Sequence, residues 1–257
     1  MEIYQHFRKE EQPFIDNVVS WKEEVGRSFT RKLTDFLDPR ERMIFQSIIG
    51  QDEDFVWKAY GGPDHAERQR MILAPFYEEI EEKDFEVTLL EASYPSKFVT
   101  LEHRDVLGAF MSLGVVRKKL GDLIVTEDKI QILVASEIAD YVKMNLTGVK
   151  KAGIQFAEKP IDNLLPSEEE WLQKDGTVSS LRLDVVLKEI YTLSRQKAVQ
   201  FIEKGQIKVN YRTVESSSFE LREGDLISFR GKGRSLLTSV HGQTKKEKWR
   251  VSYAKLK

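Results

Sequence analysis

The middle of the chain alternates between short apolar strands and amphipathic helices in an order that few folds can accommodate. Alternating apolar and polar residues predict a strand, whereas apolar residues three and four apart predict a helix. The patterns give, in order, a strand over Phe85–Leu90, a helix over His103–Leu113, strands over Asp122–Thr126 and Lys129–Val134, a helix from the cap Ser136 to Asn145, and a strand over Gly153–Ala157. This β-α-β-β-α-β order predicts a ferredoxin-like domain at residues 81–158.

The residues before this domain are predicted to form a mainly helical domain, residues 1–80. Apolar residues within Pro13–Val25 recur at the spacing of one helix face. Asp38-Pro39 begins a second helix, because aspartate is a good N-cap and proline suits the first turn, and Gly50 ends it. Phe55–Tyr60 is predicted to be a strand.

The residues after it are predicted to form a linker or a short connecting helix, 159–180, and a small α+β domain, 181–257. The linker carries Pro160, Pro166 and an acidic run. In the C-terminal domain, an apolar stripe predicts a first helix near Leu183–Ile190, and Ser194 caps a second helix. Strands are expected over Gln206–Val209, Leu226–Arg230 and within Lys248–Ala254, with turns at Asn210-Tyr211 and Glu223–Asp225. The fold class predicted for the whole chain is α+β.

Charge divides the chain at the start of this C-terminal domain. The net charge of −2 argues against nucleic acid as a partner, but it hides a split. Residues 181–257 hold 17 Lys and Arg against 8 Asp and Glu, whereas residues 1–180 hold 23 against 34. The asymmetry predicts an anion-binding C-terminal unit on an acidic body.

The second helix of the basic domain is the best candidate for phosphate binding. Lys197, Gln200 and Lys204 share one helix face. Arg195 lies in the first turn, where the helix dipole favours an anion, so its presence suggests a phosphate to be bound. Each single lysine is more simply explained as a solvated surface residue, but the ensemble with its net charge favours RNA. Further candidates follow the helix: Lys208 and Asn210, and then Arg230, Lys232 and Arg234 with Gly231 and Gly233 between them.

These residues carry a family resemblance. Arg182–Asp184, Leu193–Arg195, Ile202–Gly205, Ile207–Asn210 and Glu223–Asp225 with Arg230-Gly231 resemble the S-four RNA-binding domain, which is named for a small-subunit ribosomal protein. In that family, two helices and the following turn form an L-shaped surface that holds structured RNA. The resemblance implies that Arg182, Ser194, Arg195, Lys197, Gln200, Lys204, Lys208 and Asn210 face RNA. It also implies that Asp184 and Asp225 are structural.

The rest of the chain is similar to one subset of such proteins, the bacterial YlmH family. Leu101–Gly108, Leu113-Gly114 and Lys119–Asp122 resemble the middle domain of that family, and Asp38–Glu41 and Gly61–Arg68 resemble its N-terminal part. The resemblance implies a ribosome-associated RNA-binding protein, related in role to small factors that bind the large subunit carrying a stalled peptidyl-tRNA. Genes of the family often lie beside cell-division genes.

Arg104, Arg117, Lys118 and Lys119 form the concentrated positive charge of the middle domain. Two interpretations carry equal weight. The four residues are a second RNA contact, or the last three complement the dipole of the helix that ends near Gly114. The middle domain lacks the aromatic signature of an RNA-recognition motif, so an RRM-like fold here would not bind RNA by stacking on those aromatics.

Several classes of function find no support in the sequence. The absence of cysteine excludes disulfides, thiol nucleophiles, thiolate zinc sites and iron–sulfur clusters. The four histidines lack metal-ligand spacing, and no phosphate-binding loop or kinase signature is present. No stretch approaches the roughly 20 apolar residues of a membrane span. We therefore expect no catalytic residues, cofactor or metal, and a cytoplasmic, monomeric protein.

Three hypotheses remain. The first is a non-enzymatic protein that binds ribosomal RNA or ribosome-bound tRNA, with the ribosomal large subunit as a partner and protein partners on its acidic part. The second is an RNA-modifying enzyme with an unrecognised active site. The third is a cell-division-associated adaptor.

Overall fold

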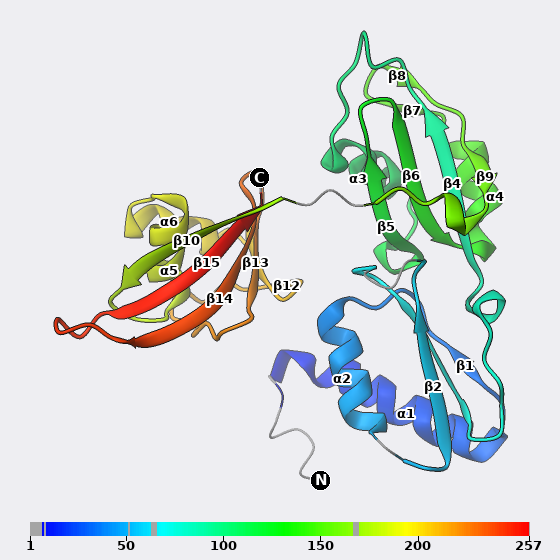
Figure 1. Cartoon of the computed structure of the whole chain (residues 1–257), viewed down its shortest axis with the longest axis horizontal. Coiled ribbons are helices and arrows are strands. Elements are labelled where there is room, and N and C mark those ends of the chain that lie inside the picture. The colour runs from blue at the N-terminus through cyan, green and yellow to red at the C-terminus, as the bar shows by residue number, and fades with distance from the viewer. Residues whose placement is uncertain (1–6, 8, 51, 63–65, 167–169, 257) are drawn as a thin grey trace. The chain divides into compact units, whose positions relative to one another are not determined.

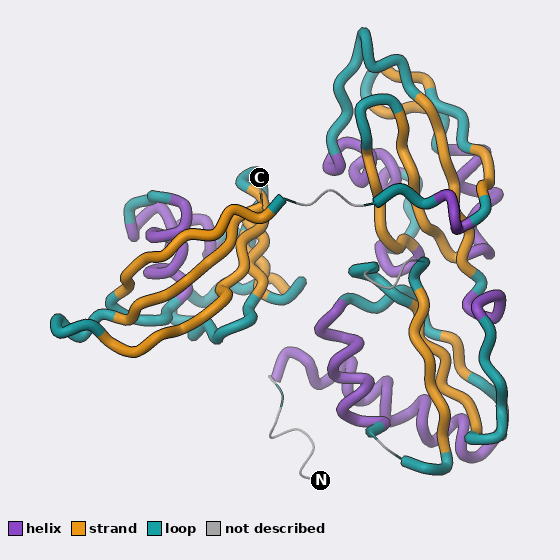
Figure 2. Tube along the Cα trace, viewed as in Figure 1, coloured by secondary structure: helices purple, strands orange, loops and turns teal. Residues whose placement is uncertain are grey.

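The computed structural model describes all residues except 1–6, 8, 51, 63–65, 167–169 and 257 (Figure 1). It contains two compact units, Met1–Ser167 (unit 1) and Glu168–Lys257 (unit 2). Both units mix helices and strands (Figure 2), which confirms the predicted α+β class. None of the helices among the described residues is long and apolar enough to cross a bilayer.

Unit 1 begins with two helices packed on a three-stranded sheet. The helices are α1 (Gln12–Ser28) and α2 (Pro39–Ile49), and the strands lie in the order β1 (Lys32–Leu33), β3 (Arg70–Pro75), β2 (Phe55–Tyr60). Both helices and β2 were predicted, whereas β1 and β3 were not. All six residues of β3 are buried, because the helices cover one face of this central strand and apolar side chains cover the other. Such a continuous apolar run has no period that separates strand from helix.

Asp38 begins α2 as the sequence predicts. Its Oδ1 accepts a hydrogen bond from the backbone N–H of Glu41 at 2.8 Å, and the Glu41 carboxylate accepts one in return from the backbone N–H of Asp38 at 3.1 Å. This reciprocal pair is a capping box. Burial, reinforced by the negative charge of Glu41, raises the pKa of Asp38 to about 6.

The second half of unit 1 has the predicted ferredoxin-like order. The elements are β4 (Val87–Ser93), α3 (His103–Ser112), β5 (Leu120–Val125), β6 (Lys129–Ala135), α4 (Ala139–Asn145) and β9 (Ala157–Lys159). The sheet order is β5-β6-β4-β9, and every pair is antiparallel. A small hairpin, β7 (Gly148–Val149) and β8 (Ala152–Gly153), precedes the last strand, which therefore starts later than predicted. Ser136 does not cap α4; its hydroxyl lies 2.8 Å from that of Thr88.

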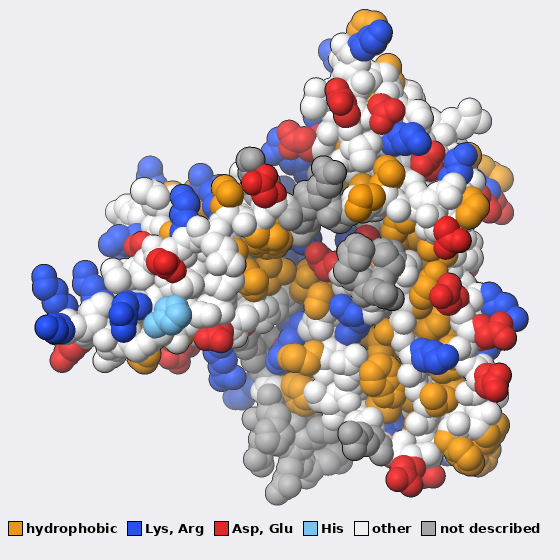
Figure 3. Space-filling model, viewed as in Figure 1, with side chains coloured by type: hydrophobic (Ala, Val, Ile, Leu, Met, Phe, Trp, Pro, Cys, Tyr) orange, Lys and Arg blue, Asp and Glu red, His pale blue; other side chains and the backbone are white. Residues whose placement is uncertain are grey.

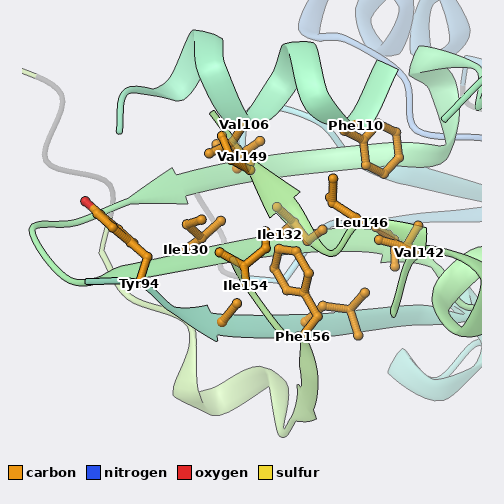
Figure 4. Packing of buried hydrophobic residues seen from close by; sticks show 14 of the residues in the cluster. Tyr94, Val106, Phe110, Ile130, Ile132, Val142, Leu146, Val149, Ile154 and Phe156 are labelled. Carbon is orange, nitrogen blue, oxygen red and sulfur yellow. The ribbon is translucent and has the colours of Figure 1, made fainter. Parts of the chain in front are cut away.

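Apolar side chains fill the space between this sheet and its helices (Figure 4). Val106 and Phe110 of α3 and Val142 of α4 are fully buried against Ile130 and Ile132 of β6. These side chains alternate with residues on the opposite face of the sheet, as strand geometry requires.

Unit 2 is a six-stranded antiparallel sheet with two helices on one face. The helices are α5 (Leu183–Tyr191) and α6 (Arg195–Glu203). The strands, in sheet order, are β10 (Trp171–Val178), β15 (Trp249–Leu256), β14 (Gly233–Gln243), β13 (Leu226–Phe229), β11 (Ile207–Val209) and β12 (Arg212–Thr213). Apolar side chains of α5 and α6 pack against Ile207, Val209, Ile227 and Phe229, so the helices cover that face of the sheet.

The expectation of a linker over residues 159–180 requires correction. Trp171–Val178 is strand β10, which pairs along its whole length with β15. Polar and acidic residues predicted a linker here because β10 is an edge strand with a mostly exposed surface. The partner that orders this strand lies about eighty residues later in the chain, so no local pattern reveals it.

Candidate nucleic-acid interface

A buried carboxylate organises the beginnings of α5 and α6. Asp184 is 1% exposed and accepts hydrogen bonds from Arg195 Nε at 2.7 Å and from Arg182 Nε at 3.1 Å. Burial opposes ionisation of Asp184, but the two arginines outweigh it and lower the pKa of the carboxyl. The structural role expected for Asp184 is therefore observed. It also accounts for Arg195 in a first helical turn, where the dipole disfavours a cation.

Arg182 and Arg195 still present part of each guanidinium to solvent. Their side chains are 39% and 58% exposed. We call Asp184 with Arg182 and Arg195 the Asp184 clamp. An arginine has five N–H donors, so the nitrogens that do not reach Asp184 are held facing outward by this clamp. The clamp positions both guanidinium groups and limits their rotamers, which favours binding of a phosphate.

The exposed face of α6 has the arrangement that the sequence predicts. The Ser194 hydroxyl accepts a hydrogen bond from the backbone N–H of Lys197 at 3.2 Å and so caps the helix. Ala198 and Ile202 are buried against the sheet, which leaves Lys197, Gln200 and Lys204 exposed.

The turn between β13 and β14 adds two cations beside the end of α6. The backbone N–H of Arg230 donates to the carbonyl of Gln206 at 3.0 Å, which ties the turn to the residues that follow α6. Lys232 Nζ lies 6.0 Å from the centre of the Phe229 ring, and that ring packs on Phe201 of α6. We call the set Lys197, Gln200, Lys204, Arg230 and Lys232 the α6 surface. No ion pair is found for its four cations among the described residues.

Two predicted site residues lie on the other side of the sheet. Lys208 is directly opposite Ser228, and Ser228 is directly opposite Arg234. Their neighbours Ile207 and Val209 point into the core beneath the helices, so Lys208 and Arg234 point to the helix-free face. The structure therefore does not bring them together with the α6 surface.

Asn210 organises a turn. Its Nδ2 donates to Asp225 Oδ1 at 2.7 Å, and its Oδ1 accepts from the backbone N–H of Leu226 at 3.0 Å. Asn210 and Tyr211 both have positive φ, which a tight hairpin turn requires. Both ends of the Asn210 amide thus serve the fold, and its contact with RNA stays a prediction. Asp225, which also accepts from the backbone N–H of Arg222, is structural as expected.

The cations of the middle domain are engaged within unit 1. Lys119 lies 2.5 Å from carboxylate oxygens of both Asp35 and Glu137, and Lys118 lies 3.5 Å from Glu41. These contacts join the ferredoxin-like part to the N-terminal helices and sheet. Arg117 donates to the carbonyl of Leu120 at 2.6 Å, three residues away.

These contacts give the middle-domain cluster a role within unit 1, and a second RNA contact there stays a prediction. Lys118 and Lys119 stabilise the packing within unit 1, and their 3-10 turn, Arg117–Lys119, is separate from the end of α3. Arg104 is 71% exposed and pairs with Glu102 at 2.9 Å. The four residues therefore do not form one accessible basic surface.

The sheet face opposite α3 and α4 is also covered. Phe36, Ile161 and Leu164 pack there against Leu133. Gln131 fastens the segment over this face, since its Nε2 donates to the carbonyl of Asn163 at 2.9 Å and its Oε1 accepts from the backbone N–H of Leu165 at 2.7 Å. The face that an RNA-recognition motif uses for base stacking is therefore filled by the chain itself.

Among the described residues, no group of three or more His, Asp or Glu side chains is arranged to hold a metal ion. The α6 surface therefore holds four cations without a carboxylate partner in the described part of the chain. Unpaired Lys and Arg side chains of this kind are chemically suited to phosphate oxygens.

Comparisons with known proteins match the ferredoxin-like part of unit 1 and part of unit 2 to two family models. A family model described as "S4 domain" matches residues 181–227, and one described as "Putative RNA-binding domain in YlmH" matches residues 81–163. The chain is 43% identical over its whole length to "Ribosome-associated protein quality control protein P2" of Bacillus subtilis (strain 168), of which it covers 99%. A solved structure, "Cell division protein ylmH from Streptococcus pneumoniae", aligns with 63% of this chain and 99% of that chain at 29% identity, with a TM-score of 0.56.

Proposed function

Because the chain belongs to the YlmH family of ribosome-associated proteins with RNA-binding domains, we propose that it binds structured RNA on the ribosomal large subunit as a translation or quality-control factor. Both resemblances seen in the sequence are confirmed. The RNA is ribosomal RNA or ribosome-bound tRNA. The protein acts without catalysis, as a monomer, in the cytoplasm where ribosomes are.

One observation carries the proposal. The α6 surface gathers four cations and one amide inside the segment matched by the S-four family, or directly after it, and none of its cations has an acidic partner among the described residues. RNA phosphates would supply the negative charges that these cations lack within the protein. The clamped Arg182 and Arg195 extend this set toward the start of α6. The net negative charge of residues 1–180 limits non-specific RNA binding, and the surface of this part of the chain is available to protein partners.

The variant K197Q/K204Q/R230Q tests the site. It removes three positive charges from exposed positions that have no ion-pair partner in the described part of the chain, so we expect an unchanged fold. We expect weaker binding to a labelled RNA stem-loop, and a plot of log K against log salt whose slope is smaller by about one for each phosphate that the variant no longer binds. The charge-preserving variant K197R/K204R/R230K is the control and should bind as the wild type does. Equal affinities of the two variants would refute the site.

The name of the solved structure favours a second candidate function. That relative is called a cell division protein, so an adaptor role in division is the alternative. The two functions differ in what the protein sediments with. An adaptor stays at the top of a sucrose gradient loaded with ribosomes, whereas a large-subunit factor migrates with the large subunit.

A further inference from the structure

The hairpin formed by β14 and β15 ends in a second basic cluster. Lys245, Lys246, Lys248 and Arg250 are exposed, and Glu247 is the one acidic residue between Gly242 and Arg250. Figure 3 shows Lys and Arg side chains gathered at the free end of this hairpin. None of the four cations forms an ion pair with the described residues. The cluster lies beyond residue 227, where the match to the S-four family ends.

The end of the hairpin is held in one conformation by its own backbone. The backbone N–H of Thr244 donates to the carbonyl of Lys248 at 2.7 Å, and that of Glu247 donates to the carbonyl of Thr244 at 2.9 Å. The Thr244 hydroxyl accepts from the backbone N–H of Lys248 at 3.2 Å. Glu247 takes a positive φ of 55°, which closes the loop. Three lysines are therefore projected from a loop of defined geometry.

The hairpin is also fixed to the rest of unit 2. The backbone N–H of Val240 donates to the Glu223 carboxylate at 2.9 Å, and β10 pairs with β15 as far as Trp249. His241 lies 2.9 Å from the hydroxyl of Ser252, which donates to Asp175 at 2.6 Å. These contacts tie the hairpin to the sheet.

The distance from the α6 surface follows from the length of β14. Arg230 and Lys232 lie at the turn before this strand, and the lysine cluster lies after its end. A straight 11-residue strand at about 3.3 Å per residue would span about 36 Å. The two register shifts in the pairing of β14 with β15 shorten it, so the two clusters lie roughly 30 Å apart. One rigid sheet therefore carries two uncompensated cationic clusters at its opposite ends.

We propose that the β14–β15 hairpin is a second phosphate contact, which binds the backbone of the same RNA about 30 Å from the α6 surface. Lysine without a carboxylate partner suits phosphate oxygens and carries no base preference. A flat acidic protein surface would need to match both clusters at this spacing, whereas an RNA helix presents phosphates along its whole length. The inference rests on the proposed function and deepens it, because it assigns residues outside the matched domain to RNA.

The variant K245Q/K246Q/K248Q tests this contact with a labelled RNA duplex of about 20 base pairs, longer than the roughly 16 that a double-stranded-RNA-binding domain spans. The slope of log K against log salt is about 0.9 for each phosphate bound. Taken from 1 M to 0.1 M salt, this slope gives a loss of affinity at 0.1 M of about eightfold for one lost contact and about five-hundredfold for three. K245R/K246R/K248R keeps the charge and should bind as the wild type does. E247Q removes the one acid and should bind more tightly.

The outcomes separate this inference from the proposed function. An unchanged affinity and salt slope for K245Q/K246Q/K248Q, with reduced values for K197Q/K204Q/R230Q, would overturn the hairpin contact and leave the α6 surface standing. A wild-type protein that does not bind the duplex would overturn both. If K245Q/K246Q/K248Q loses the binding to anionic lipid vesicles that the wild type shows, and keeps its RNA binding, the hairpin contacts a membrane surface and the proposal is overturned.

Discussion

Substitution of Asp184 by Asn tests the clamp at the start of α5 and α6. The change keeps the size of the side chain and removes the charge that Arg182 and Arg195 share. Hydrogen bonds to a charged group contribute about 1.5–3 kcal/mol each when buried, whereas exposed ion pairs contribute about 0.2–1 kcal/mol. Asp184 is 1% exposed, whereas the side chains of Arg182 and Arg195 are 39% and 58% exposed. Both arginines can therefore be solvated by water when the carboxylate is lost. We therefore expect D184N to lower the free energy of unfolding by about 1–2 kcal/mol.

Thermal unfolding of the full chain measures this loss. In a unit of the size of Glu168–Lys257, about 1 kcal/mol shifts Tm by about 4–8 °C, so the expected shift is about 4–16 °C. D175N is a matched control, because Asp175 also accepts a side-chain hydrogen bond in unit 2 but lies exposed. Its Tm should stay near that of the wild type.

The pH dependence separates charge from packing. The folded pKa of Asp184 is lower than its ordinary value of 3.8, so its contribution is present above that value and is lost as the pH falls through the folded pKa. The stability difference between wild type and D184N should therefore shrink in strong acid. A Tm of D184N within about 2 °C of the wild type at pH 7 would refute the clamp. A difference that persists unchanged in strong acid would show that packing, not charge, is responsible.

Three further substitutions test unit 1. Because burial raises the pKa of Asp38 from 3.8 to about 6, the wild-type chain should lose up to about 3 kcal/mol of stability as the pH rises from about 4 to 7. D38N keeps a capping oxygen and should remove this dependence; an identical pH profile in urea unfolding would contradict it. G121A places a Cβ 2.7 Å from the buried ring of Phe36 and should cost about 1–3 kcal/mol. G108A, at an exposed position of α3 with nothing within 4 Å, should gain about 0.5–1 kcal/mol; a G121A melting curve equal to that of G108A would refute the packing.

Features that depend only on residues close together in the sequence could be predicted. The ferredoxin-like order follows from local periods, and the Asp38 and Ser194 caps follow from single residues before helices. Features that depend on a distant partner could not. β10 is ordered by β15, and Lys119 reaches Asp35 across 84 positions of sequence.

The candidate site divides in the same way. Helical spacing places Lys197, Gln200 and Lys204 together, and the structure agrees. The face taken by Lys208 and Arg234 depends on the strand register, which no local pattern states. The hairpin cations do leave a signal, a dense run of lysines between two alternating apolar segments. That signal gains meaning only once both strands are known to belong to one rigid sheet.

Sedimentation with ribosomes tests the central claim most directly. Wild-type protein, K197Q/K204Q/R230Q and K197R/K204R/R230K are each run on sucrose gradients with separated ribosomal subunits at low salt. We expect the wild type and the charge-preserving variant to migrate with the large subunit, and K197Q/K204Q/R230Q to be depleted from that fraction. A wild-type protein that stays at the top of the gradient, or a Gln variant that still migrates with the large subunit as the wild type does, would contradict the account.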